Sequence, residues 1–286
     1  MTWENWIGRS AQFRDLLTPA ALARFCATLD HLWDMQGNAP AAPQGIHWCL
    51  CLPDAPTAQL GTDGHPRRDD SPDSFMPPLP LPRRMWAASN VHFHAPISAG
   101  AAIDRTSTIA SITEKNGSTG QLFFVEVAND TMADGALAVR ETQSIVFRAP
   151  APIIKPVPTI PAAPASAPDL SSWQWQRKVT PYAAMLFRYS ALTFNSHRIH
   201  YDTPYAQHEE GYPDLVVHGP LTATLLLDLA QRQLGINALK HFQMRAISPA
   251  FVNQDLYLVG KPAEDGGWTL AALGPDGRTI MTAKAG

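Results

Sequence analysis

Hydrophobic and polar positions repeat with two different periods along the chain, and the changes between them outline the predicted elements. In the first half, the apolar residues of TPAALARFCATLDHLW (18–33) have helical spacing, with Thr18 as the expected N-cap and Pro19 as the first helical residue. The pattern then favours strands, at residues 46–52, 85–97, 102–115, 121–132 and 136–148. An Asn116-Gly117 pair predicts a hairpin turn between two of these strands.

The second half repeats this order. One helix is predicted at 181–192 and another at 219–234, which Gly219 opens and Gly235 ends. Apolar residues surround the second helix on nearly all sides, so we expect it to be buried. Strands are predicted to follow, at residues 242–252, 255–264, 267–274 and 278–285. Asp276-Gly277 predicts the last hairpin turn.

A proline-rich segment divides the chain into two units. Prolines within residues 149–172 block both helix and central strand, so this segment is interpreted as a linker between a first unit, 1–148, and a second, 173–286. Because each unit combines a long apolar helix with several strands, we expect an α+β fold with one antiparallel sheet running across both. A weak echo between HAPISAG (94–100) and AISPAFVNQ (246–254) fits an internal repeat but does not establish one alone.

A second proline-rich stretch lies between the first two predicted strands. Residues 53–82 are polar and rich in turn formers, which predicts a long flexible excursion from the sheet. The Arg67-Arg68 pair within it, like the Arg83-Arg84 pair just beyond it, can serve a small anionic ligand.

Composition narrows the classes of protein. Of the 286 residues, 45% are hydrophobic, which is enough to bury a sizeable core. The 22 basic and 25 acidic residues nearly balance, so nucleic acid is not an expected partner. No apolar run approaches the roughly 18 residues of a membrane helix, and MTWENWIGRSAQF lacks the apolar core of a signal peptide. The three cysteines, Cys26, Cys49 and Cys51, predict reduced thiols without zinc in a cytoplasmic protein.

Candidate chemistry concentrates in the second half, in RYSALTFNSHRIHYD (188–202) and in VVHGPL (216–221). Gly219 begins the predicted buried helix, where free backbone N–H groups carry about half a unit of positive charge. Such an amide can stabilise the oxygen of a polarised carbonyl, and glycine lets a ligand approach the backbone closely. A simple tight turn into a core helix is the alternative interpretation.

These two segments resemble a known family. NSHRIHYD is similar to the D-x-N-P-[LI]-H-x-D signature of the MaoC-like hydratases, and VVHGPL resembles the H-G segment that follows it. Together with LPRRMWA (81–87), the chain most resembles the type 2 3-hydroxyacyl-thioester dehydratases and the mesaconyl-C4-CoA and itaconyl-CoA hydratases. The resemblance implies a double hotdog fold, two repeats in which a long helix is wrapped by an antiparallel sheet.

Three residues match the family pattern directly. His200 stands at the catalytic histidine, Asp202 at the aspartate two residues later, and Gly219 at the glycine whose amide binds the thioester oxygen. The helix-start sequence Asp202-Thr203-Pro204 favours a cap over an acid. His218, next to Gly219, is assigned to substrate binding, with packing at the turn as the alternative.

Three positions depart from the pattern. Asn195 stands where the family has its catalytic aspartate, His197 where it has asparagine, and Arg198 where it has proline. Asparagine can hold a water but cannot accept its proton usefully, so the base role passes to His200. His197 is expected to orient the loop or bind substrate.

The implied reaction is the reversible hydration of an enoyl-CoA thioester. Gly219 would stabilise the enolate-like oxygen, while His200 takes a proton from a water held against Asn195 and returns one to Cα. No metal or cofactor is expected beyond the CoA of the substrate. We expect one active site per chain, with the first half shaping the acyl tunnel, and the sequence leaves homodimer formation open.

Arginines decide the expected acyl group. Arg83, Arg84, Arg188 and Arg198 are candidates for CoA phosphates or for a second carboxylate, with a solvated or ion-paired arginine as the alternative for each. An arginine in the acyl pocket favours a C5 dicarboxylic substrate such as mesaconyl-C4-CoA or itaconyl-CoA, whereas an apolar pocket favours a fatty enoyl thioester. A hotdog thioesterase and a non-catalytic acyl-binding module remain alternatives.

Overall fold

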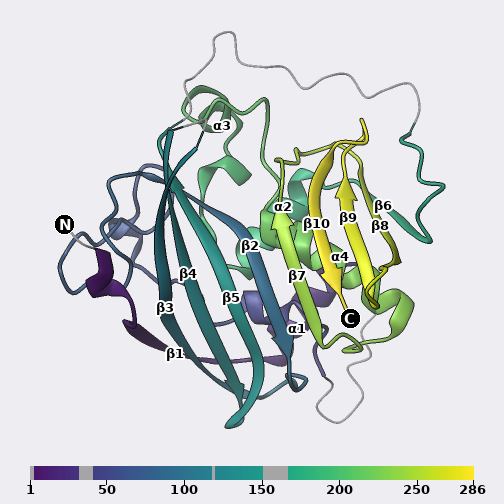
Figure 1. Cartoon of the computed structure of the whole chain (residues 1–286), viewed down its shortest axis with the longest axis horizontal. Coiled ribbons are helices and arrows are strands. Elements are labelled where there is room, and N and C mark those ends of the chain that lie inside the picture. Colours follow the sequence, from purple (N-terminus) through teal and green to yellow (C-terminus); the bar gives the residue numbers. More distant parts are fainter. Residues whose placement is uncertain (1–2, 32–40, 118–119, 151–166) are drawn as a thin grey trace.

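One antiparallel sheet of ten strands dominates the described part of the chain and runs through both halves (Figure 1). This computed structural model describes residues 3–31, 41–117, 120–150 and 167–286. The strands are β1 (Ser10–Leu16), β2 (Arg83–Phe93), β3 (Ala102–Gly117), β4 (Gly120–Ala133), β5 (Ala136–Arg148), β6 (Trp175–Val179), β7 (His241–Ala246), β8 (Leu256–Pro262), β9 (Trp268–Leu273) and β10 (Thr279–Ala285). The expectation of a single large sheet is confirmed.

The strand order establishes the internal repeat. From the centre outward, the first half runs β2-β5-β4-β3-β1 and the second runs β7-β10-β9-β8-β6, which is the same order with five added to each number. Antiparallel pairing of β2 with β7 joins the halves, with His92 opposite His241. The weakly similar segments 94–100 and 246–254 lie at the ends of these two strands, so they occupy equivalent places.

The helices lie against the sheet and do not follow the repeat fully. They are α1 (Pro19–Thr28), α2 (Ala183–Leu192), α3 (Thr203–His208) and α4 (Gly219–Leu234), with short 3-10 helices η1 (Trp3–Trp6), η2 (Ile46–Cys49), η3 (Thr57–Gln59) and η4 (Arg198–His200). The helices α1 and α2 follow equivalent strands, β1 and β6, and they contact each other. No described helix is both long and apolar enough to cross a membrane.

The long helix α4 has no counterpart in the described residues of the first half. Between α1 and β2, the described residues of the first half form only η2 and η3, so the helix of this half is the shorter α1. Residues 221–231 of α4 are buried, in agreement with its apolar composition. One hydrophobic core contains leucines of α4, such as Leu225, together with Leu22 and Phe25 of α1.

Local signals in the sequence predicted most element ends. Thr18 caps α1 by accepting a hydrogen bond from the Ala21 N–H at 3.1 Å, and Gly235 ends α4. The predicted start of the second helix at 181 is two residues early, because Tyr182 is its N-cap and provides no side-chain capping bond. The strands β3 and β4 pair down to Gly117 and Gly120, as a hairpin does, while residues 118–119 lie outside the described residues.

Three sequence-based expectations need correction or lie outside the described residues. The strand predicted at 46–52 is wrong, since its first part is η2 and Gly45 turns the chain there with a φ of 102°. A side-chain carbon at Gly45 would lie 3.4 Å from Leu227 of α4, so the apolar residues here cover the helix rather than extend the sheet. Strands β1 and β6 were not predicted. Most of the linker predicted at 149–172 lies outside the described residues.

The excursion 53–82 does not extend freely from the sheet as predicted. It crosses to the second half, where Ser196 donates to the Gly64 carbonyl at 2.5 Å and the Arg198 N–H donates to the Asp63 carbonyl at 2.9 Å. Arg198 also donates from Nη1 to the Thr62 carbonyl at 2.9 Å. Gly64 is buried with a φ of 89°, and any side chain there would collide with the Ser196 carbonyl. These contacts join a loop of the first half to residues 195–202.

A buried ion cluster fixes α4 in the core. The Asp228 side chain is fully buried and pairs with Arg177 of β6, with His31 and, at 2.9 Å, with Arg232. Burial would raise the pKa of Asp228, but its hydrogen bonds and the neighbouring cations lower it. The carboxylate is therefore ionised in the folded protein and ties the helix to strand β6 and to the end of the α1 segment.

Replacing Asp228 by Ala should lower the free energy of unfolding by about 3 kcal/mol, because it removes the buried carboxylate that partly buried Arg177 and His31 contact. Urea unfolding at pH 7 measures the change. Since the folded pKa of Asp228 is lowered, its stabilisation is present above the unfolded carboxyl pKa and is lost as the pH falls. The exposed Asp265→Ala, which removes a surface pair with Lys284, is the control and should unfold like the wild type. Equal stability of the two variants would contradict the anchoring role.

Replacing Gly64 by Ala should separate the 61–65 loop from residues 195–202, because the new methyl group collides with the Ser196 carbonyl. Hydrogen exchange should rise in both segments. Gly100→Ala is the matched control, since Gly100 has nearly the same φ, 88°, but open space around it. This control should lower the free energy of unfolding by about 1–2 kcal/mol, because alanine is strained at a left-handed φ. It should not raise hydrogen exchange in the 61–65 loop or in residues 195–202. Similar exchange patterns in both variants would refute loop docking.

Candidate active site

His200 lies in η4 and is buried, with one ring nitrogen fixed. Its Nδ1 is 2.7 Å from the Val216 carbonyl. A carbonyl can only accept, so Nδ1 carries the hydrogen and Nε2 carries the lone pair. Burial is the main cause that lowers the pKa of His200 to about 3, which keeps the imidazole neutral at pH 7. The ring is therefore held as a neutral proton acceptor at Nε2.

His218 places this ring beside the start of α4. Its imidazole stacks on that of His200, with ring centroids 3.6 Å apart and planes 19° apart. Its Nε2 lies 2.9 Å from the Ser190 hydroxyl, whereas Nδ1 is buried with no partner among the described residues. Burial lowers the pKa of His218 well below its usual value. His218 thus supports His200 and directly precedes Gly219, the first residue of α4.

Gly219 offers the amide that the sequence predicted. As a first-turn residue, its N–H has no acceptor within the helix, and the residue is only partly buried. A side chain added there would lie 3.6 Å from Trp86 of β2. Trp86 in turn packs edge-on against Trp48, with centroids 5.4 Å apart. The first half therefore supplies aromatic side chains beside this amide, and its role in shaping an acyl site stays a prediction.

Asn195 lies in the loop between α2 and η4, and its side chain closes a turn there. Its Oδ1 accepts from the His197 N–H at 3.0 Å, and its own N–H donates to the Ser190 carbonyl at 2.9 Å. The amide nitrogen Nδ2 remains as a donor, which can bind a water oxygen but cannot remove a proton. The water-holding role of Asn195 stays a prediction, for which Nδ2 is the remaining group.

Asp202 and Arg198 stabilise the loop. Asp202 caps α3 by accepting from the Tyr205 N–H at 3.1 Å, as its sequence context favours. Arg198 donates to the same carboxylate from Nε and Nη2 at 3.0 and 2.7 Å, and its guanidinium lies over the Tyr205 ring. These contacts occupy the polar atoms of both side chains, so their predicted contact with substrate would have to replace an existing partner.

The remaining candidate arginines differ in availability. Arg83 is paired with Glu210 and also donates to the Glu209 carbonyl at 3.1 Å. Arg188 is exposed on α2. Arg84 makes no hydrogen bond or ion pair with the described residues and is accessible to solvent, yet surrounding protein lowers its pKa, while Asp63 opposes this effect. Solvent access and the lack of a partner among the described residues leave Arg84 available to an anion.

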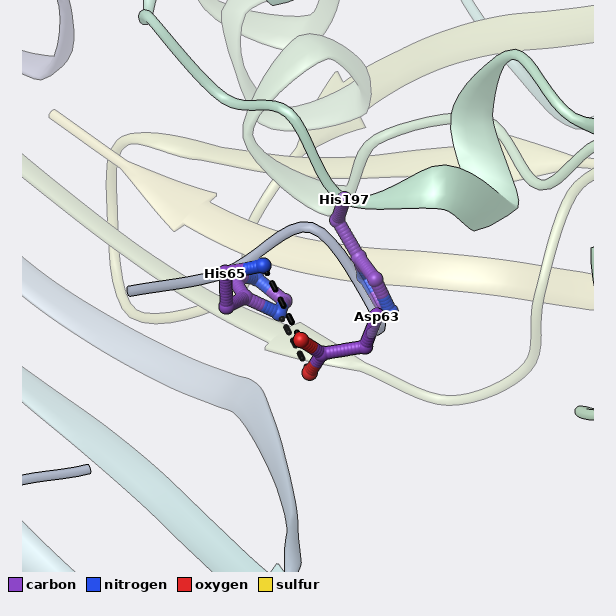
Figure 2. A group of neighbouring side chains, drawn as sticks. All are labelled: Asp63, His65 and His197. Carbon is purple, nitrogen blue, oxygen red and sulfur yellow. Dashed lines mark hydrogen bonds and ion pairs between the residues drawn. The ribbon is translucent and has the colours of Figure 1, made fainter. Parts of the chain in front are cut away.

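Two residues near this site were not predicted. Asp63 and His65 come from the 53–82 excursion, where His65 Nδ1 lies 3.1 Å from Asp63 Oδ2 (Figure 2). The His65 ring lies 4.1 Å from that of His197, which is 5.6 Å from His200. The only signal in the sequence was the Asp63-Gly64-His65 run itself, whose position across from the second half depends on tertiary contacts.

Asp63, His65 and His197 bring three ligand-type atoms within 4.8 Å of one another, a spacing that one cation can bridge. The positive charge of Arg84 acts on both Asp63 and His197, which disfavours a second cation at the same place. The bond from His65 already uses one carboxylate oxygen. The cluster therefore fits acid–base chemistry beside an arginine better than metal binding.

Comparison with known proteins agrees with the sequence resemblance. The family model for hydroxyacyl-thioester dehydratase type 2 matches residues 45–252. A mesaconyl-C(4)-CoA hydratase of Chloroflexus aurantiacus is 42% identical, with 98% of this chain and 96% of the relative covered. A mitochondrial hydroxyacyl-thioester dehydratase type 2 of Schizosaccharomyces pombe is 28% identical, with 85% and 87% covered.

Solved structures agree on the fold. A MaoC-like dehydratase has a TM-score of 0.72 at 15% identity, covering 99% of both chains. A double-hotdog protein of Mycobacterium tuberculosis has a TM-score of 0.58 at 13% identity, covering 98% of this chain and 95% of the other. The α+β double hotdog expected from the sequence is confirmed. The chain belongs to the hydroxyacyl-thioester dehydratase type 2 family.

Proposed function

We propose that this chain catalyses the reversible hydration of an enoyl-CoA thioester, with a C5 dicarboxylic acyl group such as mesaconyl-C4-CoA or itaconyl-CoA as its substrate. Its relatives are named as hydratase and dehydratase, so the enzyme class is that of carbon–oxygen lyases. The observation that carries the proposal is the neutral imidazole of His200, which has a free Nε2. This ring stacks on His218, the residue directly before Gly219.

The Gly219 amide is assigned to the thioester oxygen. When water adds to Cβ, negative charge develops on this oxygen as an enolate. A backbone N–H at the start of α4 meets that charge without having to reorient, and the helix dipole acts in the same direction. Trp86 and Trp48 limit access of water on one side. Stabilisation is therefore greater in the transition state than in the bound substrate.

Asn195 and His200 are assigned to the water. The Asn195 Nδ2 group holds the water oxygen, and His200 Nε2 accepts the water proton as the oxygen bonds to Cβ. Since His200 Nδ1 donates to Val216, the ring cannot turn its protonated nitrogen to the substrate without losing a buried hydrogen bond. The thioester acidifies Cα, so protonation there completes hydration, and the reverse steps dehydrate the 3-hydroxyacyl thioester.

Arg84 supports the dicarboxylic substrate. Of the two arginines on β2, Arg83 is neutralised by Glu210, whereas Arg84 has no anionic partner at ion-pair distance among the described residues. A distal carboxylate of a C5 acyl group, or a CoA phosphate, would supply that partner. The 42% identity with a mesaconyl-C(4)-CoA hydratase favours the carboxylate.

A fatty acyl substrate is the second candidate. The indoles of Trp86 and Trp48 form an apolar surface beside Gly219, which suits an alkyl chain. The relative from Schizosaccharomyces pombe is named as a hydroxyacyl-thioester dehydratase without a dicarboxylic substrate. A substrate panel of mesaconyl-C4-CoA, itaconyl-CoA, crotonyl-CoA and a long-chain enoyl-CoA separates the two candidates. Loss of enoyl absorbance without release of free thiol identifies hydration, and thiol release would instead identify a thioesterase.

Replacing His200 by Asn should lower kcat for hydration by about 10² to 10⁴, because the proton acceptor is lost. Loss of enoyl absorbance at saturating substrate measures it. His208→Asn, at an exposed histidine of α3, is the control and should retain wild-type kcat. A His200→Asn enzyme with wild-type kcat and an unchanged melting temperature would rule out His200 as the base.

Replacing Arg84 by Gln should raise KM for dicarboxylic substrates about ten- to hundredfold, as expected for the loss of a charged hydrogen bond. KM for crotonyl-CoA should change little if the arginine binds the acyl carboxylate. Arg14→Gln, at an exposed arginine of β1, is the control. An equal rise of KM for crotonyl-CoA would instead assign Arg84 to a CoA phosphate, against the dicarboxylic proposal.

A further inference from the structure

We propose that Asp63 and His65, contributed by the first repeat, form a second acid–base pair of the active site and supply the carboxylate that position 195 lacks. The inference rests on the hydratase function proposed above. Figure 2 shows the pair on one segment, facing His197 of the second repeat. The pair thus lies against the loop that carries Asn195 and His200, although Gly64 and Ser196, which join the two segments, are 132 residues apart in sequence.

The hydrogen bond between Asp63 and His65 determines which ring nitrogen of His65 carries a hydrogen. Burial would raise the pKa of Asp63, but the ring and backbone hydrogen bonds from His65 outweigh it and lower that pKa to about 2. An ionised carboxylate can only accept, so His65 Nδ1 donates at 3.1 Å and Nε2 is left for proton transfer.

The pair has charged and titratable neighbours, and the loop that carries it is held by protein contacts. His197 acts to lower the pKa of Asp63. The charge of Asp63 in turn acts to raise the pKa of Arg84 and of Tyr205. The Gly64 backbone is fixed by Ser196, and the Asp63 carbonyl accepts from the Arg198 N–H. Ser196 and Arg198 belong to the same loop as the expected catalytic residues. The pair is therefore held beside that loop before substrate binds.

The pair divides the proton transfers of hydration between two histidines. The water oxygen bonds to Cβ and its proton passes to Nε2 of His200. The π electrons of the double bond move to Cα, which takes a proton from Nε2 of a protonated His65. His65 ends neutral and His200 ends protonated. Transfer of that proton from His200 back to His65, past the intervening His197 ring, restores the starting state, and dehydration follows the same steps in reverse.

Asp63→Asn tests the carboxylate. Asparagine can keep the turn to the His65 N–H but loses the negative charge. Its kcat should fall about 10²-fold with KM within about threefold of the wild type. The control is Asp69→Asn, because exposed Asp69 makes the same kind of turn, to the Ser71 N–H, in the same excursion. It should leave kcat unchanged. A kcat of Asp63→Asn within threefold of that of Asp69→Asn would overturn the inference.

His65→Ala provides the readout that a structural role would not change. The variant should lose about 10²-fold in kcat because the acid is gone. Added imidazole should restore at least a tenth of the wild-type rate. An unchanged kcat, or no recovery with imidazole at a wild-type melting temperature, would overturn the role. Loss of wild-type activity with EDTA and its return with zinc would assign the cluster to a metal instead.

The two proposals fail in different ways. If the wild-type enzyme hydrates no member of the substrate panel, the proposed function fails. If the wild type hydrates and His200→Asn is impaired, while Asp63→Asn and His65→Ala match Asp69→Asn and His208→Asn, only the second acid–base pair is refuted.

Discussion

The pairing of β2 with β7 is the constraint on which the rest of the molecule depends. It turns two five-stranded halves into one sheet, so both must bury their inner faces in a common core. That core holds the long helix α4, whose counterpart is missing from the described first half. Because α4 is apolar on nearly every side, it needs cover from both repeats, and neither half of the fold has a complete core alone.

The same arrangement explains why the candidate site lies at one end of α4. The amide of Gly219 is free there, and the stacked rings of His200 and His218 come from the segment that leads into the helix. Asp228, two turns further along, holds the helix against β6 through buried ion pairs. The position of the Gly219 amide is thus determined by packing and by charges outside the candidate site.

Short-range sequence patterns predicted much of the fold and of the candidate site. Capping residues such as Thr18 and Gly235, the alternation in β2–β5 and the N-x-x-x-x-H spacing of Asn195 and His200 each specify geometry within a few residues. The strand expected at 46–52 failed because apolar residues that cover α4 have the same composition as a buried strand. Asp63 and His65 were missed for a related reason, since a proline-rich segment gives no indication of what it packs against.

The absence of a counterpart of α4 from the described part of the first repeat determines what that repeat can contribute. With η2 and η3 in place of a long helix, the chain between α1 and β2 is free to cross the sheet junction and dock on Ser196 and Arg198. A complete helix would have held its own residues in the core, as α4 does. The irregular segment of the first repeat thereby places an ionised carboxylate and an imidazole against the loop of the other repeat. An asparagine at position 195 is tolerable on this view, since the negative charge is supplied from across the junction.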